Sequence, residues 1–247
     1  MANGERPLVL AHRGARLQAP ENTVPAFLLA LELGADGVEL DVRATADGVA
    51  VCIHDGRLER TTNGRGPARQ HVWSELRALD AGGWFAPAFR GTRLCTLAEA
   101  LAALRDARLV NVELKGRPRS GHGWEERIVQ NVQESGMESR VLFSSFQLTP
   151  LLRLKRLGCT RLAWLHGPGV PWQVAVAVAG LLHLEGLHPH RRACTARYVR
   201  EAASRGIRVI PWTVNDLAEA RRLAGFLVAG LITDRPAEVR EALRTHR

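Results

Sequence analysis

The sequence predicts an α/β protein, a closed (β/α)8 barrel with a small insertion after the second strand. Short apolar, β-branched runs recur eight times along the 247 residues, and most of them start about 20 to 30 residues apart. Segments with helical periodicity and recognisable end signals separate these runs. Each interval has the length of a strand, a crossover helix and two loops, which indicates parallel strands. Eight such units in about 250 residues are typical of a closed barrel.

The expected strands are the eight apolar runs themselves. In chain order they are Leu8 to Ala11, Val38 to Val42, Leu109 to Leu114, Val141 to Phe146, Leu162 to Leu165, Leu182 to Leu187, Val209 to Thr213 and Leu227 to Thr233.

Capping residues and glycines predict where the helices begin and end. Asn22 precedes a helix that Gly34 closes, and Thr96 with Glu99 forms a capping box before a helix from Leu97 to Arg105. The same signals predict three later helices, which open at Thr149-Pro150, Thr195 and Asp216 and stop at Gly158, Gly206 and Gly225.

One interval is too long for a single strand and helix. Between Asp55 and Leu109 the chain passes through a polar, glycine-containing stretch, residues 57–93. We therefore expect one domain over residues 1–247, with an insertion at about residues 56–108.

Composition and cysteine usage predict a globular protein of the cytoplasm. The chain is 46% hydrophobic and 24% charged, and a chain of this length buries roughly 70 to 75% of its unfolded surface. The longest apolar run, around Val174 to Leu182, is far shorter than the roughly 20 residues of a membrane-spanning helix. The N-terminus has no basic start followed by a long apolar stretch. The four cysteines have neither zinc-site nor disulfide-framework spacing, so we expect reduced thiols.

The strongly basic charge does not by itself indicate a nucleic-acid partner. Net charge is +9, but 32 of the 34 basic residues are Arg, scattered along the chain without a block of like charge. A basic nucleic-acid-binding protein is the alternative from a different class, and the chain has no reading motif for it.

Acidic and basic residues gather where the predicted strands end, which is where catalytic groups of such barrels lie. Glu39 and Asp41 are two residues apart on one strand, so both point to the same face, as do Glu113 and Lys115 on the next strand. Buried like charges are costly unless a cation neutralises them. An all-oxygen set predicts one hard divalent cation, Mg2+ or Ca2+. The alternative is a buried salt-bridge cluster.

Two histidines and two fixed cations complete the predicted site. His12 and His54 end early strands beside the carboxylates, and a pair of imidazoles can divide acid and base roles. For either of them, a histidine of the core is the alternative. Arg13 and Lys115 add positive charge suited to a phosphate.

Motifs spread over nearly the whole chain resemble those of the glycerophosphodiester phosphodiesterases. They are His12-Arg13-Gly14, Pro20-Glu21-Asn22-Thr23, Gly34 to Val42, His54-Asp55, Arg60 to Gly66, Thr96 to Leu101, Glu113-Leu114-Lys115, Ser145-Phe146 and Trp212 to Asn215. The family is a TIM barrel with a small insertion after strand two. One departure is Cys95, which stands where the family commonly has Pro, away from the chemistry.

The resemblance assigns roles to the predicted site. It implies that Glu39, Asp41 and Glu113 hold the metal, that His12 and His54 are the acid/base pair, that Arg13 and Lys115 hold the phosphate, and that Trp212 lines the pocket. The implied reaction is hydrolysis of a glycerophosphodiester to glycerol 3-phosphate and an alcohol. Which histidine is the acid, and whether water or a substrate hydroxyl attacks, stay open. A lysophospholipase D on the same site and a catalytically inactive barrel are the alternatives.

Weaker signals carry less defined expectations. Asn22 is expected to cap a helix rather than to touch the site, and His188 with His190 is expected to form an exposed loop pair. Asp234 either supports the site or caps the helix that begins near Pro236. The apolar run from Pro171 to Leu182 is expected to be buried; the alternatives are a homodimer contact and a shallow membrane contact.

Overall fold

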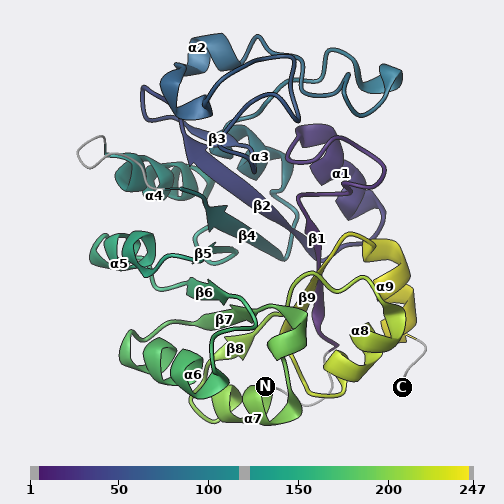
Figure 1. The fold of residues 1–247 in the computed structure, drawn as a ribbon, viewed down its shortest axis with the longest axis vertical. Coiled ribbons are helices and arrows are strands. Elements are labelled where there is room, and N and C mark those ends of the chain that lie inside the picture. The colour runs from purple at the N-terminus through teal and green to yellow at the C-terminus, as the bar shows by residue number, and fades with distance from the viewer. Residues whose placement is uncertain (1–5, 117–122, 245–247) are drawn as a thin grey trace.

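The computed structural model describes residues 6–116 and 123–244, which form one nine-stranded sheet surrounded by helices (Figure 1). The strand order is β8-β7-β6-β5-β4-β2-β1-β9, with β3 paired to β2 outside this path. The strands are β1 (Leu8–His12), β2 (Gly37–Ala44), β3 (Ala50–Cys52), β4 (Leu109–Leu114), β5 (Val141–Ser145), β6 (Leu162–His166), β7 (Gly186–Pro189), β8 (Arg208–Val209) and β9 (Gly230–Thr233).

Eight of the strands are parallel and nearly close into a barrel. Every neighbouring pair on the path is parallel, whereas β2 and β3 form an antiparallel hairpin. The two ends of the path meet through backbone hydrogen bonds, from the Ala229 N–H to the Val209 carbonyl (2.8 Å) and from the Ile232 N–H to the Pro211 carbonyl (3.0 Å). The predicted (β/α)8 barrel is confirmed.

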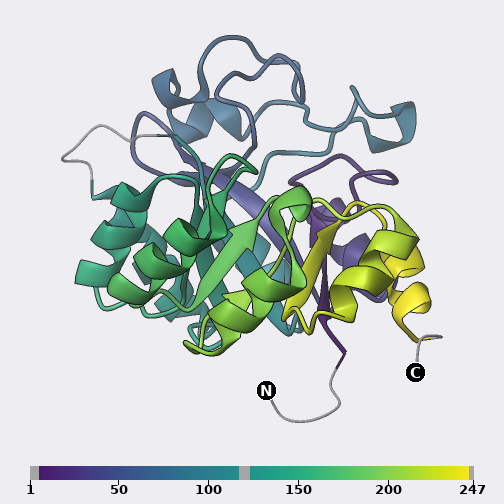
Figure 2. The ribbon, with the colours of Figure 1, turned by 60° about the horizontal axis from the view of Figure 1, so that its bottom comes forward.

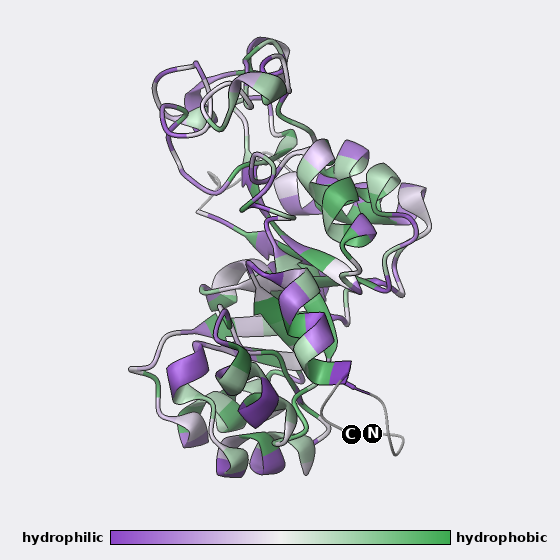
Figure 3. Cartoon of the chain, turned by 90° about the vertical axis from the view of Figure 1, so that its right-hand side faces the viewer, coloured by the Kyte–Doolittle hydropathy of each residue, from purple (hydrophilic) through white to green (hydrophobic). Residues whose placement is uncertain are grey.

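The helices form the outer ring of the barrel and carry both hydrophilic and hydrophobic residues (Figure 3). They are α1 (Val24–Glu32), α3 (Leu97–Ala103), α4 (Trp124–Ser135), α5 (Leu148–Arg156), α6 (Trp172–Leu181), α7 (Ala196–Ala203), α8 (Leu217–Ala224) and α9 (Pro236–Arg244). None of the helices in the described part of the chain is long and apolar enough to cross a bilayer.

Several predicted helix ends are present in the structure. The Thr96 Oγ1 accepts a hydrogen bond from the Glu99 N–H (3.2 Å), and the Glu99 carboxylate accepts from the Thr96 N–H (2.8 Å), so the capping box of α3 is confirmed. The Thr195 and Asp216 side chains also cap α7 and α8, where they accept hydrogen bonds from the Tyr198 and Glu219 N–H groups. Helix α5 starts at Leu148, one residue before the expected Thr149.

The insertion lies over the carboxyl end of the strands, on the side of the barrel away from the chain termini (Figure 2). It contains the short helix α2 (Trp73–Leu76) and the 3-10 turns η1 (Ala68–Gln70) and η2 (Pro87–Phe89). A small apolar cluster that includes Ile53, Leu58, Leu76 and Leu94 fills its interior. Helix α3 falls within residues 56–108 but contacts α1 and α4 in the outer ring.

Three strands differ clearly from the expectation, two of them because apolar residues also occupy helix ends and turns. Leu182 caps the end of α6 and His183 has a φ of 47°, so β7 begins only at Gly186. Leu227 is exposed with a φ of 66°, so β9 begins at Gly230. The predicted strand at Val209 to Thr213 overlaps the observed β8, residues Arg208 and Val209, only at Val209.

The run from Pro171 to Leu182 is helix α6, and its burial is one-sided. Ala175, Val176 and Ala179 are buried against the barrel, while Val174 and Leu181 are exposed. The expected burial therefore holds for one face of this helix.

Candidate active site

A cavity of about 210 Å³ lies at the carboxyl end of the barrel. All eight residues predicted for the site line it or lie beside it. His12, Arg13, Glu39, His54, Glu113, Lys115 and Trp212 line the cavity, and Asp41 lies next to Glu113 in the register of β2 and β4.

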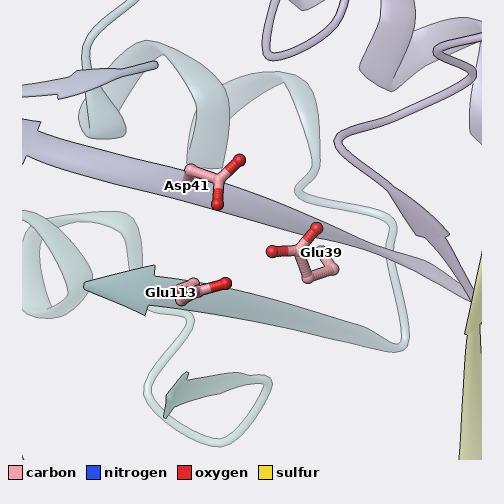
Figure 4. Close-up of side chains that lie close together, drawn as sticks. All are labelled: Glu39, Asp41 and Glu113. Carbon is pink, nitrogen blue, oxygen red and sulfur yellow. The ribbon is translucent and has the colours of Figure 1, made fainter. Parts of the chain in front are cut away.

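The three predicted metal ligands converge. Glu39 and Asp41 point from β2 and Glu113 points from β4, with their carboxylates turned toward one another (Figure 4). One oxygen of each carboxylate lies within 4.8 Å of the others, and all three side chains are buried. Strand alternation explains this geometry, because Asp41 is directly opposite Glu113 and Glu39 is two residues earlier on the same face.

The positive charges near the triad are too few to keep all three of its carboxyl groups ionised. Burial alone raises the pKa of Asp41, but Lys115 and Arg13 outweigh it and bring that pKa to about 2. Burial and the neighbouring Asp41 raise the pKa of Glu113 to about 7 and hold the pKa of Glu39 well above its usual range. A buried, all-carboxylate set that keeps protons for lack of a cation fits a hard divalent ion.

The predicted phosphate-binding cations are held by these same carboxylates. The Lys115 Nζ lies 2.6 Å from Glu113 Oε1 and 3.2 Å from Asp41 Oδ1. The Arg13 Nε lies 3.1 Å from Asp41 Oδ2, and the Arg13 N–H donates to Glu39 Oε2 (3.1 Å). Both cations therefore face the cavity from positions beside the triad.

Asn22 supports the triad, so the expectation that it caps a helix is wrong. Its Nδ2 donates to Asp41 Oδ2 (2.8 Å) and its Oδ1 accepts from the Asp41 N–H (3.1 Å). The N-terminal cap of α1 is Thr23. Asn22 has a φ of 57°, a left-handed conformation that Asn tolerates better than most residues, and this conformation accompanies its contact with β2.

His12 is oriented by a carboxylate at the other end of the chain. Its Nδ1 donates to Asp234 Oδ1 (2.8 Å), and its Nε2 lies 3.9 Å from Glu39 Oε2. The Asn215 Nδ2 in turn donates to Asp234 Oδ2 (2.7 Å). Because a carboxylate only accepts hydrogen bonds, the neutral ring carries its hydrogen on Nδ1 and leaves Nε2 as the basic nitrogen. Asp234 was expected either to support the site or to cap the helix that begins near Pro236, and its bond to His12 favours the first role.

His54 is held at both its backbone and its ring. Its Nδ1 donates to Asp55 Oδ1 (2.6 Å), and its carbonyl accepts from the Arg43 Nε (2.8 Å). Burial lowers the pKa of His54 despite the attraction of Asp41. A neutral imidazole with its free Nε2 is the form that can accept a proton.

Aromatic side chains form part of the cavity wall. The Trp212 ring meets the Phe146 ring edge to face at 5.4 Å, and its Nε1 donates to the His188 carbonyl (2.9 Å). Phe146 is 45% exposed, and the Lys115 Nζ lies 5.7 Å from its ring centre. This wall offers an apolar surface to the organic part of a substrate.

The predicted exposed loop pair of His188 and His190 is wrong for His188. His188 lies on β7, opposite Leu165 of β6, and is completely buried, so burial lowers its pKa to about 3. His190 is half-buried and meets the Trp212 ring edge to face at 5.2 Å.

Sequence reasoning missed the residues that support the reacting groups. Arg43, Glu21 and Arg60 contact predicted site residues or their partners, yet none was assigned a role. Glu21 and Arg60 lie in two of the motifs that carry the family resemblance, which is the signal that could have pointed to them.

A strand-end cavity with paired imidazoles and clustered carboxylates makes this chain a barrel enzyme of phosphate-ester chemistry. The sequence model of the glycerophosphoryl diester phosphodiesterase family matches residues 12–238. The chain belongs to this family, and it is a glycerophosphodiester phosphodiesterase. Enzymes of the family depend in general on a divalent metal ion, for which the acidic triad is present here.

Relatives of known sequence and structure agree with this assignment. A glycerophosphodiester phosphodiesterase of Caldanaerobacter subterraneus is 37% identical over 94% of this chain and 95% of the relative. The structure of a phosphodiesterase of Oleispira antarctica, in complex with the product sn-glycerol-3-phosphate, is 30% identical with a TM-score of 0.83 and covers 97% of both chains. A glycerophosphodiester phosphodiesterase of Agrobacterium tumefaciens is 31% identical with a TM-score of 0.81, over 94% of this chain and 98% of that one.

Proposed function

We propose that this enzyme hydrolyses glycerophosphodiesters to glycerol 3-phosphate and an alcohol, with His12 and His54 as the acid/base pair. The observation that carries the proposal is that both imidazoles line one cavity with the acidic triad, and that each has its Nδ1 bound to a carboxylate. The Oleispira relative was solved with sn-glycerol-3-phosphate as product, which supports the same product for this chain.

A phosphodiester anion repels nucleophiles and has a strongly basic leaving group, so catalysis must neutralise charge and deliver a proton. Glu39, Asp41 and Glu113 would hold one divalent cation, Mg2+ or Ca2+, and the bound cation would neutralise negative charge on the phosphate. Arg13 and Lys115 bind nonbridging phosphate oxygens from the same side of the cavity. One imidazole takes the proton of the nucleophile at its Nε2, and the other donates a proton to the departing alkoxide.

The aromatic wall gives the substrate its orientation. Trp212 and Phe146 line the same cavity as Glu39 and Glu113, and the organic part of the diester packs on their rings while the phosphate lies toward Arg13 and Lys115. This arrangement also removes water from the apolar side of the reacting phosphate.

The test uses purified enzyme with glycerophosphocholine as substrate. We expect His12→Ala and His54→Ala each to lower kcat about 10²- to 10⁴-fold, the usual loss when a positioned acid or base is removed. A chelator should abolish turnover, and Mg2+ or Ca2+ should restore it. His71→Ala, which removes a histidine of the insertion that bonds Glu75, is the matched control and should keep full activity. Full turnover of either site variant, or of chelated enzyme, would contradict the scheme.

The lysophospholipase D alternative uses the same residues and differs in substrate. Turnover of lysophosphatidylcholine measured beside glycerophosphocholine separates the two activities. We expect the smaller diester to be preferred, because the cavity beside the triad is only about 210 Å³.

We propose that residues 1–247 form one domain with an insertion at about 56–108, that the enzyme works in the cytoplasm in glycerol and lipid metabolism, and that nucleic acid is not a partner. A homodimer is compatible with the exposed Val174 and Leu181 of α6, and sedimentation of the full chain tests it.

A further inference from the structure

One arginine of the insertion connects the acid/base site to the barrel. The Arg60 Nε donates to Asp55 Oδ2 (2.5 Å), while its two terminal nitrogens donate to both oxygens of Glu21, at 3.0 and 2.7 Å. Glu21 lies in the loop between β1 and α1, and its side chain is only 4% exposed. A single guanidinium therefore joins a residue beside His54 to a buried carboxylate of the barrel.

The hydrogen bond from Arg60 to Asp55 connects Arg60 to His54 through a single residue. Asp55 accepts from Arg60 with one oxygen and from the His54 Nδ1 with the other, at 2.6 Å. The ring of His54 therefore takes its direction from Asp55, and Asp55 takes its direction from Arg60.

The bond to Glu21 reaches the triad and the second histidine. Glu21 also accepts from the Arg13 NH1 (2.9 Å) and the Arg16 NH2 (3.3 Å). The Arg13 Nε lies 3.1 Å from Asp41, and the Arg16 NH1 lies 3.6 Å from Asp234, the partner of His12. Glu21 is the common carboxylate of three arginines around the cavity.

The charges of this network support one another. Burial alone raises the pKa of Glu21, but its hydrogen bonds with Arg60 and the charges of Arg13 and Arg16 hold that pKa below its usual range. The Arg60 hydrogen bond likewise keeps the pKa of Asp55 well below its usual range. Both carboxylates are therefore charged at neutral pH, which favours bidentate pairing with an arginine.

We propose that Arg60 is a positioning residue, through which the docked insertion orients His54 for proton transfer by way of Asp55. The inference rests on the proposed role of His54 in the reaction. It explains why the Pro20 to Thr23 and Arg60 to Gly66 motifs, which hold none of the predicted acid, base or metal groups, accompany the reacting residues in this sequence. The insertion thereby contributes to catalysis, because one of its residues orients His54.

A positioning role can be separated from a structural one. Arg60 and Asp55 have side chains 42% and 31% exposed, and an ion pair of that exposure contributes little to folding. The buried Glu21 keeps its hydrogen bonds to Arg13 and Arg16 when Arg60 is lost. A small misplacement of a reacting group, in contrast, can reduce turnover about 100-fold. Turnover and stability should therefore respond very differently to loss of Arg60.

The first experiment replaces Arg60 by Met and measures glycerophosphocholine turnover, melting temperature and Mg2+ affinity by calorimetry. We expect kcat to fall about 10- to 100-fold, with KM and metal affinity changed less than about 3-fold, because Glu21 keeps Arg13 and Arg16. Arg60→Lys should recover part of the loss, since one ammonium can still reach one of the two carboxylates. Arg57→Met is the matched control: Arg57 lies in the same segment, is 66% exposed and, among the described residues, forms its ion pair with Glu59 alone.

The second experiment tests whether Arg60 acts through Asp55. Asp55→Asn should lower kcat by a similar factor, and the Arg60→Met/Asp55→Asn double variant should lose little beyond the larger single loss. Losses that multiply, a kcat unchanged in Arg60→Met, or an equal loss in Arg57→Met would each overturn the inference. Wild-type enzyme inactive on every glycerophosphodiester would instead refute the proposed function, so the two failures are distinguishable.

Discussion

His12 depends for its chemical form on a residue 222 positions away in the chain. Asp234 directly follows β9, and β9 is the parallel neighbour of β1, the strand that ends at His12. The side chains of His12 and Asp234 therefore meet where these two adjacent strands end. The carboxylate fixes the hydrogen on Nδ1 and turns Nε2 toward Glu39. His54 has the same arrangement with its neighbour Asp55. Two imidazoles with the same tautomer therefore face one cavity.

At the residue scale we predict that Asp234→Asn lowers kcat about 10²- to 10⁴-fold, because an amide can donate to Nδ1 and stabilise the wrong tautomer. Steady-state kinetics with glycerophosphocholine check this, and the melting temperature should change little. Asp106→Asn, at an exposed position 3.9 Å from Arg105, is the control. Equal kinetics for the two variants would show that Asp234 does not set the tautomer of His12.

At the element scale, β2 is the strand on which the site is built. Glu39, Asp41 and Arg43 follow one another at intervals of two residues and therefore lie on one face of β2. The first two residues supply two of the three carboxylates of the triad, and the Arg43 side chain donates to the His54 carbonyl. The strand begins at Gly37, where a Cβ would lie 1.8 Å from the Leu109 carbonyl oxygen of β4. Only glycine allows β4 to approach closely enough to set Asp41 opposite Glu113.

We therefore predict that Gly37→Ala destabilises the fold by about 1 to 3 kcal/mol or more, the usual cost of overpacking, and weakens metal binding through the register of β2 and β4. Thermal unfolding and calorimetry measure the two effects. Gly180→Ala in α6, where an added Cβ meets nothing within 4 Å, is the control, and it should stabilise the helix by about 0.5 to 1 kcal/mol. A Gly37→Ala protein as stable as wild type would mean that the strands can separate without cost.

At the scale of the whole molecule, stability and metal binding are linked through the protons of the triad. Glu113 has a pKa raised to about 7, so between its unfolded value and about pH 7 the metal-free folded state keeps a proton that the unfolded state has lost. The proton on Glu113 favours the folded state at pH values below the pKa of Glu113 in the unfolded chain. This stabilisation is lost as the pH rises through the pKa of Glu113 in the folded protein. A divalent ion bound to the triad would offset the burial and the Asp41 charge that raise the pKa of Glu113. To bind, the ion must displace the Glu113 proton.

The stabilisation by Mg2+ or Ca2+, measured as the difference in melting temperature with ion and with chelator, should therefore increase from pH 5 to pH 8. Histidines that titrate alike with the ion and with the chelator cancel in this difference. Glu113→Gln should remove most of the pH dependence. A difference that is constant across this range would contradict the protonated triad.

The sequence alone was enough for the barrel and for most of the polar residues that line its cavity. Strand-length apolar runs at regular intervals specify parallel strands, and residues two apart on a strand must share a face, so Glu39, Asp41, Glu113 and Lys115 could be placed together in advance. His12 and His54 could be placed beside them because the carboxyl ends of parallel strands lie at one end of a barrel.

Only the tertiary structure decided which side chains support these groups. Asn22 was expected to cap a helix, yet it binds Asp41; His188 was expected at the surface, yet it lies inside the barrel. The partners of the histidines and the role of Arg60 depend on hydrogen bonds between loops, whose paths no periodicity specifies. Local sequence determines which face a residue occupies, whereas the packing of distant segments determines what that face meets.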